Sequence, residues 1–152
     1  MVAIVRPLHR ILAHPTLFSQ CISNLLDNAA KFVAPGGQPR VIIRSEVVDA
    51  NDALANDRHC DLSGRKLQSS RRICARYVRL WVEDNGIGMD SITREKVFGM
   101  FERAREAKQY PGTGIGLAIL AKAIERMNGR FGVESEPGAG SRFWIDLPPA
   151  AE

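Results

Sequence analysis

The chain has 152 residues, of which 45% are hydrophobic and 25% are charged. This is enough apolar material for the core of one globular domain and too little for two comfortable ones. The formal net charge is +4, and the basic residues are scattered among 17 acidic ones, so composition does not indicate binding to nucleic acid or to a membrane surface. A small polyanionic ligand would suit this charge equally well.

The cysteines are Cys21, Cys60 and Cys74. They form no CxxC pair, so we expect neither a disulfide framework nor a zinc site. No apolar run approaches the roughly 18 residues of a membrane span, and the opening of the chain is unlike a signal peptide. These features predict a cytoplasmic protein.

The first predicted elements are a strand and a helix. Residues 2–12 are apolar with interspersed basic residues, which suits an opening strand, and Pro15 offers a helix start. In the helix the apolar residues fall within one stripe of about 100°, as packing against a core demands. They are Phe18, Ile22, Leu25, Leu26, Ala29 and Val33. Pro35-Gly36-Gly37 ends this helix.

Alternating apolar residues predict two further strands, Val41–Val48 and Arg76–Glu83. The polar stretch between them, about residues 49–75, is long for a hairpin connection, so we expect a mobile insertion there. Its basic cluster is either a contact surface or, as for most charged loops, solvated. The cluster comprises Arg65, Lys66, Arg71 and Arg72.

The second half of the chain predicts a short helix at Ser91–Phe101, a charged lid-like segment, a helix at Ile115–Met127 and a closing hairpin. Asn128-Gly129 supplies the left-handed stop that helices prefer. The hairpin strands, Phe131–Ser135 and Ser141–Leu147, alternate about a turn at residues 137–140. This order of elements predicts a mixed sheet with helices packed on one face.

Two glycine-punctuated turns carry the strongest functional signal. They are Asp84-Asn85-Gly86-Ile87-Gly88-Met89 and Gly112-Thr113-Gly114-Ile115-Gly116-Leu117. Glycine has no Cβ, so the backbone can adopt positive φ or approach a ligand closely. Because the second turn runs straight into a helix, it predicts a phosphate-binding site at that helix N-terminus.

Asn24, Asn28 and Lys31 share one face of the first helix, opposite its apolar stripe. A solvated face is the simplest explanation, but asparagine is a poor helix former, and two of them one turn apart cost stability unless their amides serve a purpose. A magnesium ion that bridges phosphates accepts such an oxygen ligand, and a lysine adds a positive charge for the phosphates.

Asp84 is predicted at the end of a strand, directly before the first glycine turn. Its carboxylate can accept a hydrogen bond from an exocyclic amine, which would select adenine over guanine. An isolated Asp-Asn-Gly is usually only a turn. The second glycine turn is what favours the nucleotide interpretation.

Four segments resemble, in order, the motifs of sensor histidine kinases. The segment 24–32 resembles their N box, 84–89 their first glycine box, 97–103 their F box and 112–119 their second glycine box. Residues 110–116 are most similar to phytochrome-related and hybrid sensor kinases. A family-like ending at residues 132–148 extends the resemblance over nearly the whole chain.

The resemblance implies an α+β fold, the two-layer Bergerat sandwich shared with gyrase, Hsp90 and MutL ATPases, with a mixed, mostly antiparallel sheet and helices on one face. The whole chain, 1–152, would be one ATP-binding catalytic domain with a nucleotide lid at about residues 99–112. Phe98 and Phe101 would anchor that lid to the core.

The resemblance also implies the roles of individual residues. Asn28 would bind Mg²⁺ with support from Asn24, while Lys31 would contact phosphate and Phe32 would line the adenine pocket. Asp84 would accept the adenine amine, and Gly86 and Gly88 would let the base approach. The edge over the phosphates would comprise Gly112, Thr113, Gly114, Ile115, Gly116 and Leu117.

Asn24 distinguishes this chain from the ATP-hydrolysing members of the superfamily, which carry a glutamate there as general base. An amide cannot accept a proton, so we expect little hydrolysis and transfer of the γ-phosphoryl group to a histidine on a separate dimerising helical hairpin. A response regulator would be the indirect partner. His9, His14 and His59 do not lie in a phosphoacceptor pattern.

Two alternatives remain open. An anti-sigma type serine kinase of the same fold would phosphorylate a hydroxyl on a bound protein, although the F box argues against it. A nucleotide-binding module without transfer activity is the other, although all motif residues are present.

Overall fold

A computed structural model of the chain describes residues 1–51, 75–99 and 114–151. Most of the predicted insertion and of the predicted lid, together with Phe101, Gly112 and Thr113, lies outside the described residues. Within the described ranges, no helix is both long enough and apolar enough to cross a lipid bilayer.

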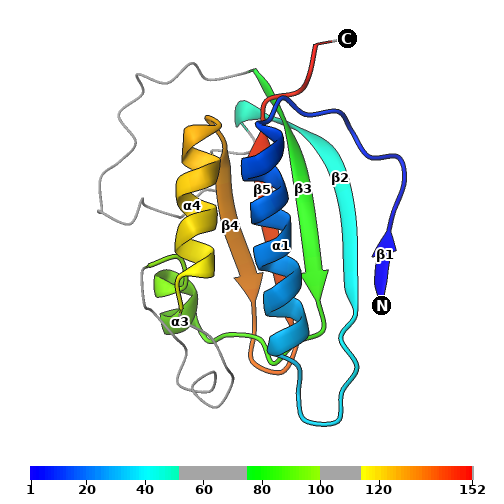
Figure 1. Cartoon of the computed structure of the whole chain (residues 1–152), viewed down its shortest axis with the longest axis vertical. Coiled ribbons are helices and arrows are strands. Elements are labelled where there is room, and N and C mark those ends of the chain that lie inside the picture. The colour runs from blue at the N-terminus through cyan, green and yellow to red at the C-terminus, as the bar shows by residue number, and fades with distance from the viewer. Residues whose placement is uncertain (52–74, 100–113, 152) are drawn as a thin grey trace.

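The structure is a two-layer sandwich of one sheet and a layer of helices (Figure 1). The strands are β1 (Val2–Ile4), β2 (Val41–Asp49), β3 (Arg76–Asp84), β4 (Arg130–Ser135) and β5 (Ser141–Leu147). They form a five-stranded sheet in the order β1-β2-β3-β5-β4, in which only the β1–β2 pair is parallel. The helices are α1 (Pro15–Lys31), α3 (Ser91–Lys96) and α4 (Gly116–Arg126). The predicted α+β fold class is confirmed.

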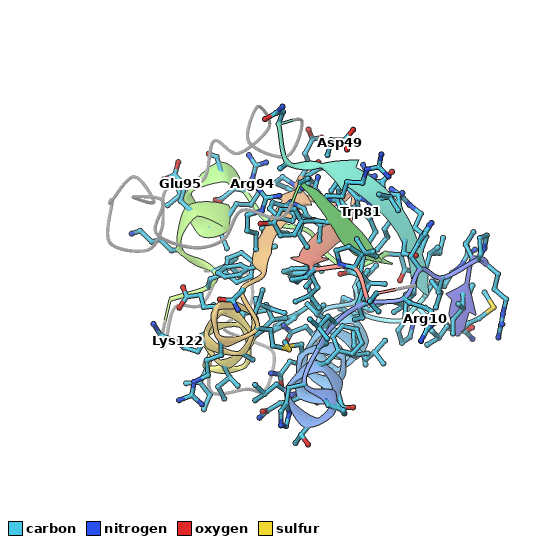
Figure 2. All side chains as sticks on the ribbon, turned by 90° about the horizontal axis from the view of Figure 1, so that it is seen from above. Arg10, Asp49, Trp81, Arg94, Glu95 and Lys122 are labelled. Carbon is cyan, nitrogen blue, oxygen red and sulfur yellow. The ribbon has the colours of Figure 1, made fainter. Side chains whose placement is uncertain are left out.

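Helices α1 and α4 lie side by side on one face of the sheet (Figures 1 and 2). Pro15 occupies the first turn of α1, where its missing N–H costs nothing. The buried residues of α1 are Cys21, Leu25 and Ala29. Leu25 and Ala29 belong to the predicted stripe, whose buried centre is rotated toward Cys21. Burial raises the pKa of the Cys21 thiol to about 11, which keeps it neutral.

Helix α4 ends as its sequence predicts. Asn128 has a φ of 57°, which is the left-handed conformation that asparagine tolerates. The Gly129 N–H then donates to the Ile124 carbonyl at 2.9 Å. A Cβ on Gly129 would lie 2.5 Å from the Asp146 carbonyl oxygen, so this stop needs a glycine as well as a left-handed residue.

The core lies between the helices and the sheet. Alternate residues of the strands face the helices, and α3 is followed by Phe98, which is 5% exposed. The Phe98 ring packs edge-on against Phe131, with centroids 4.7 Å apart. Phe98 is therefore part of the core, while the predicted lid that follows it lies mostly outside the described residues. The buried strand residues in this core are Val41, Ile43, Val82, Val133, Phe143, Ile145 and Leu147.

The opening strand is shorter than predicted. Strand β1 comprises only Val2–Ile4, and Val5 still donates to the Ile43 carbonyl at 2.8 Å. Pro7 has no N–H and cannot continue a ladder. The next contact to β2 is made by His9, whose N–H donates to the Ser45 hydroxyl at 2.9 Å.

The other face of the sheet carries a buried ion-pair network centred on Asp146, which is fully buried. Its carboxylate accepts two hydrogen bonds from Arg79, at 2.7 and 2.8 Å, and one from Arg130 at 3.0 Å. The Arg79 guanidinium also lies 4.3 Å from the ring centroid of Trp144. Figure 2 shows the neighbouring Trp81 on this face, away from α1 and α4. The network joins β3, β5 and β4.

We predict that Asp146→Ala lowers the free energy of unfolding by about 3–5 kcal/mol, because it leaves two guanidinium groups without their buried carboxylate. Urea denaturation measures the change. Glu134→Ala is the matched control, since it removes a more exposed partner of Arg142 on the same face and should cost no more than about 1 kcal/mol. Equal losses in the two variants would contradict the assigned role of Asp146.

Candidate functional site

Four segments far apart in the sequence meet at one end of the sandwich, the lower end in Figure 1. They are the C-terminal end of α1, the turn after β3, the turn between β4 and β5, and the N-terminal end of α4. Those predicted site residues that the structure describes are distributed over three of these four segments.

Asp84, the last residue of β3, is held by backbone amides. Its Oδ1 accepts hydrogen bonds from the N–H groups of Gly86 at 2.8 Å and Ser141 at 3.2 Å. Its Oδ2 accepts no hydrogen bond from the described part of the chain. Burial raises the pKa of this carboxyl above its ordinary value, and the two amide bonds only partly offset that rise. One carboxylate oxygen is therefore fixed by the fold and the other can accept a hydrogen bond from a ligand.

The turn after β3 is packed tightly against α1. The Ile87 N–H donates to the Phe32 carbonyl at 2.8 Å. A Cβ on Gly86 would lie 2.6 Å from that same carbonyl oxygen, so the close approach requires glycine. Phe32 is the half-buried C-cap residue of α1.

The same turn is packed against the β4–β5 turn. Gly88 has a φ of +71°, and a Cβ there would overlap the carbonyl oxygen of Glu136. Gly140 has a φ of +77°, and its Cβ would overlap the carbonyl oxygen of Asp84. The Gly138 N–H donates to the Ile87 carbonyl at 2.7 Å. The two turns thus meet backbone to backbone.

Part of the site is not predicted by the sequence. Residues 137–140 are expected from the sequence only to form a hairpin turn, whereas the structure places Gly140, Ser141 and Ser135 beside Asp84. The sequence signal that could have identified these residues is a third glycine-containing turn, at residues 137–140, with Ser135 before it and Ser141 after it.

Asn85 was also missed, although it holds the segment between α1 and β2. Its Oδ1 accepts from the Arg40 N–H at 2.7 Å, and its Nδ2 donates to the Gln38 carbonyl at 3.0 Å. Asn85 is therefore a structural residue, and it fixes the turn after β3 on the side away from β5.

The polar face of α1 adjoins α4. Asn24 and Asn28 are half-buried and Lys31 is exposed. The Asn24 Nδ2 donates to the carbonyl of Gly116, the first residue of α4, at 3.0 Å. The Asn28 amide makes no hydrogen bond within the described ranges, so its oxygen can serve a ligand.

The first turn of α4 provides backbone N–H groups. Gly114 has a φ of +73°, and the N-cap residue Ile115 gives no side-chain cap. Unsatisfied N–H groups and the helix dipole favour an anion here. Leu117 lies in the core with 9% exposure, so only its backbone can contact a ligand.

The described residues include no cluster of three or more His, Cys, Asp or Glu side chains that could hold a metal ion. A single amide oxygen such as that of Asn28 does suit Mg²⁺, which keeps waters and takes its other ligands from phosphates.

The chain belongs to the histidine kinase-, DNA gyrase B- and HSP90-like ATPase family, whose model matches residues 13–151. Within this family its relatives are sensor histidine kinases. The sensor histidine kinase AruS of Pseudomonas aeruginosa is 35% identical over 130 residues, which cover 84% of this chain and 11% of AruS. The phytochrome-like protein Cph1 of Synechocystis is 46% identical over 67 residues, 44% of this chain and 9% of Cph1.

A structure of full-length ShkA in complex with AMPPNP is also similar, with a TM-score of 0.67 and 26% identity. The match covers 99% of this chain and 25% of that chain. The chain thus spans about a tenth of the length of the curated relatives it matches. The recognised resemblance to the catalytic domain of sensor histidine kinases is confirmed.

We predict that Gly140→Ala is much more damaging than Gly138→Ala. Both glycines have positive φ, which costs an alanine about 1 kcal/mol or more. A Cβ on Gly138 meets nothing within 4 Å, whereas one on Gly140 lies 3.0 Å from the Asp84 carbonyl carbon and would move β5 off the turn. Urea denaturation and near-UV circular dichroism measure the difference. Equal effects would mean that the contact between the turns is not tight.

Proposed function

We propose that the chain binds Mg-ATP and transfers the γ-phosphoryl group to a histidine on a separate dimerisation and phosphoacceptor domain. The observation that carries this proposal is the arrangement of Asp84, whose Oδ1 is held by two backbone amides while its Oδ2 makes no hydrogen bond in the described chain. Membership of the ATPase family supports ATP as the substrate.

The free Oδ2 of Asp84 would accept a hydrogen bond from the exocyclic amine of adenine. Guanine presents a carbonyl at that position, which an ionised carboxylate repels. The glycines at 86 and 88 keep side chains out of the turn beside Asp84, and Phe32 would line the pocket on the side of α1. The AMPPNP complex of ShkA is consistent with adenine nucleotide binding by this fold.

The phosphates would lie between α1 and the N-terminal end of α4. Asn28 would hold the magnesium ion through its amide oxygen, and Lys31 would add a positive charge. The helix N-terminus at residues 114–117 would donate backbone N–H groups to the phosphates, in continuity with Gly112 and Thr113. When bound, the metal neutralises charge on the phosphates and helps to align them.

Asn24 would favour transfer over hydrolysis. Its amide donates to the Gly116 carbonyl and has no basic atom with which to activate water. An acceptor histidine supplied by another domain would form the new P–N bond, while the bond from the γ-phosphorus to the β–γ bridging oxygen breaks and ADP leaves. A response regulator would then receive the phosphoryl group indirectly.

A transfer assay tests this proposal. The chain is mixed with γ-labelled ATP, magnesium and a helical hairpin that carries the phosphoacceptor histidine of a sensor histidine kinase. Acid-labile, base-stable label on the hairpin is the expected result. Acid-stable label on a serine would indicate the anti-sigma type kinase, and nucleotide binding without any label transfer would indicate a module without transfer activity.

In this assay we predict that Asn28→Ala reduces transfer by roughly 100-fold, the rate change that corresponds to about 2.7 kcal/mol of lost metal and phosphate positioning. Gln20→Ala is the matched control, because it removes an exposed carboxamide two turns earlier on α1 and should leave the rate unchanged. A wild-type rate in Asn28→Ala would remove Asn28 from the metal site.

We predict that Asp84→Asn weakens adenine nucleotide binding by about 10–100-fold, as expected for a lost hydrogen bond to a charged group. The Gly86 and Ser141 amides would hold the remaining oxygen, so the new NH₂ group would face the adenine amine. Calorimetric titration with a non-hydrolysable ATP analogue measures the loss. Unchanged affinity would remove the adenine assignment.

Comparing the nucleotide affinities of wild type and Asp84→Asn at several pH values separates the titration of Asp84 from that of the ligand phosphates, because both proteins bind the same ligand. Wild-type affinity should fall relative to Asp84→Asn as the pH drops through the raised pKa of Asp84. Stability has the opposite sign, because ionisation of a buried carboxyl with a raised pKa costs free energy as the pH rises. Asp84→Asn should therefore gain stability relative to wild type on going from acidic to neutral pH. A difference in affinity and in free energy of unfolding between the two proteins that does not change with pH would contradict this account.

A further inference from the structure

Ser135 is the last residue of β4, and its buried hydroxyl lies between the two turns of the site. Its Oγ accepts a hydrogen bond from the Met89 N–H at 2.9 Å and donates to the Gly140 carbonyl at 2.8 Å. It also lies 2.9 Å from the Oγ of Ser141. One side chain therefore contacts both the turn after β3 and the turn before β5.

The direction of these bonds follows from their chemistry. A hydroxyl has one proton and two lone pairs. An amide N–H can only donate and a carbonyl can only accept, so the proton of Ser135 is committed to Gly140. Ser141 must then be the donor in the contact between the two hydroxyls. This leaves the Ser135 hydroxyl fully hydrogen-bonded and the Ser141 Oγ with acceptor capacity only.

The residues that Ser135 contacts are themselves in contact with Asp84, the carboxylate proposed to bind the base. The N–H of Ser141 donates to Asp84 Oδ1, and Gly140, whose carbonyl Ser135 holds, packs against the Asp84 backbone. The free Oδ2 of Asp84 and the Oγ of Ser141 are then both acceptors. The exocyclic amine of adenine is a donor and suits an acceptor at this point, whereas the carbonyl that guanine presents at the same position does not.

We propose that Ser135 is a positioning residue that sets the purine specificity of this site. It acts through Ser141 and Asp84 without touching the nucleotide: it fixes the spacing of the two turns and accepts the hydroxyl proton of Ser141. The proposal rests on the proposed function, because it presumes that Asp84 accepts the adenine amine.

The test compares Ser135→Ala and Ser135→Cys with wild type. The cysteine variant keeps the shape of the side chain, with a larger sulfur atom in place of oxygen, but replaces the hydroxyl by a weak donor and acceptor. Calorimetry with non-hydrolysable ATP and GTP analogues gives the ratio of the two affinities. We expect this ratio to fall by about tenfold in both variants, as for one lost hydrogen-bonding group.

Ser45→Ala is the matched control. Ser45 is a half-buried serine of β2 whose hydroxyl contacts His9, not the two turns, so the affinity ratio should not change. Urea denaturation of all variants measures the structural effect separately. A loss of stability with an unchanged ratio in both Ser135 variants would overturn the proposal. If Ser135→Ala does not fold, Ser135→Cys decides the comparison.

A double variant shows whether Ser135 acts through Asp84. If it does, Ser135→Ala adds little further loss of ATP affinity in an Asp84→Asn background. Additive losses would overturn the positioning role while leaving the adenine assignment intact. An Asp84→Asn variant with wild-type affinity would instead defeat the proposed function itself, so the two failures are distinguishable.

Discussion

The arrangement of this site depends on one close contact, in which two turns meet backbone against backbone. Gly88 and Gly140 both have positive φ, and a Cβ on either would overlap a carbonyl oxygen of the opposing turn. This contact brings the Ser141 amide to Asp84 Oδ1, while Asp84 Oδ2 accepts no hydrogen bond from the residues that the structure describes. The contact of Gly86 with Phe32 fixes the same turn to α1. The proposed specificity for adenine and the position of the asparagine-bearing helix would therefore share one structural origin.

The two faces of the sheet contribute differently to the structure. The face under α1 and α4 is apolar and positions the helix ends that would bind phosphate. The far face joins β3, β5 and β4 through the buried Asp146 and its two arginine partners. Since Asp84 and Ser141 lie on β3 and β5, this network helps to keep their separation constant. Strong pairing behind the sheet thus supports precise geometry at its end.

Features governed by local chemistry could be predicted from the sequence. The stop at Asn128-Gly129, the alternating strands and the glycine turn after Asp84 each follow from the residues present there. Features that depend on distant partners could not. Ser135 binds an amide 46 residues away, and Ser141 binds a carboxylate 57 residues away. The predicted length of β1 was wrong for a related reason. A strand continues only where the neighbouring strand offers hydrogen-bond partners, and Pro7 interrupts the pairing with β2.

A crystal structure of this chain with a non-hydrolysable ATP analogue and Mg²⁺ tests the central claim most directly. The account predicts that the exocyclic amine of the base lies within hydrogen-bond distance of Asp84 Oδ2 and that the metal is coordinated by the amide oxygen of Asn28. A base bound elsewhere, or one whose amine contacts neither Asp84 nor Ser141, would contradict it.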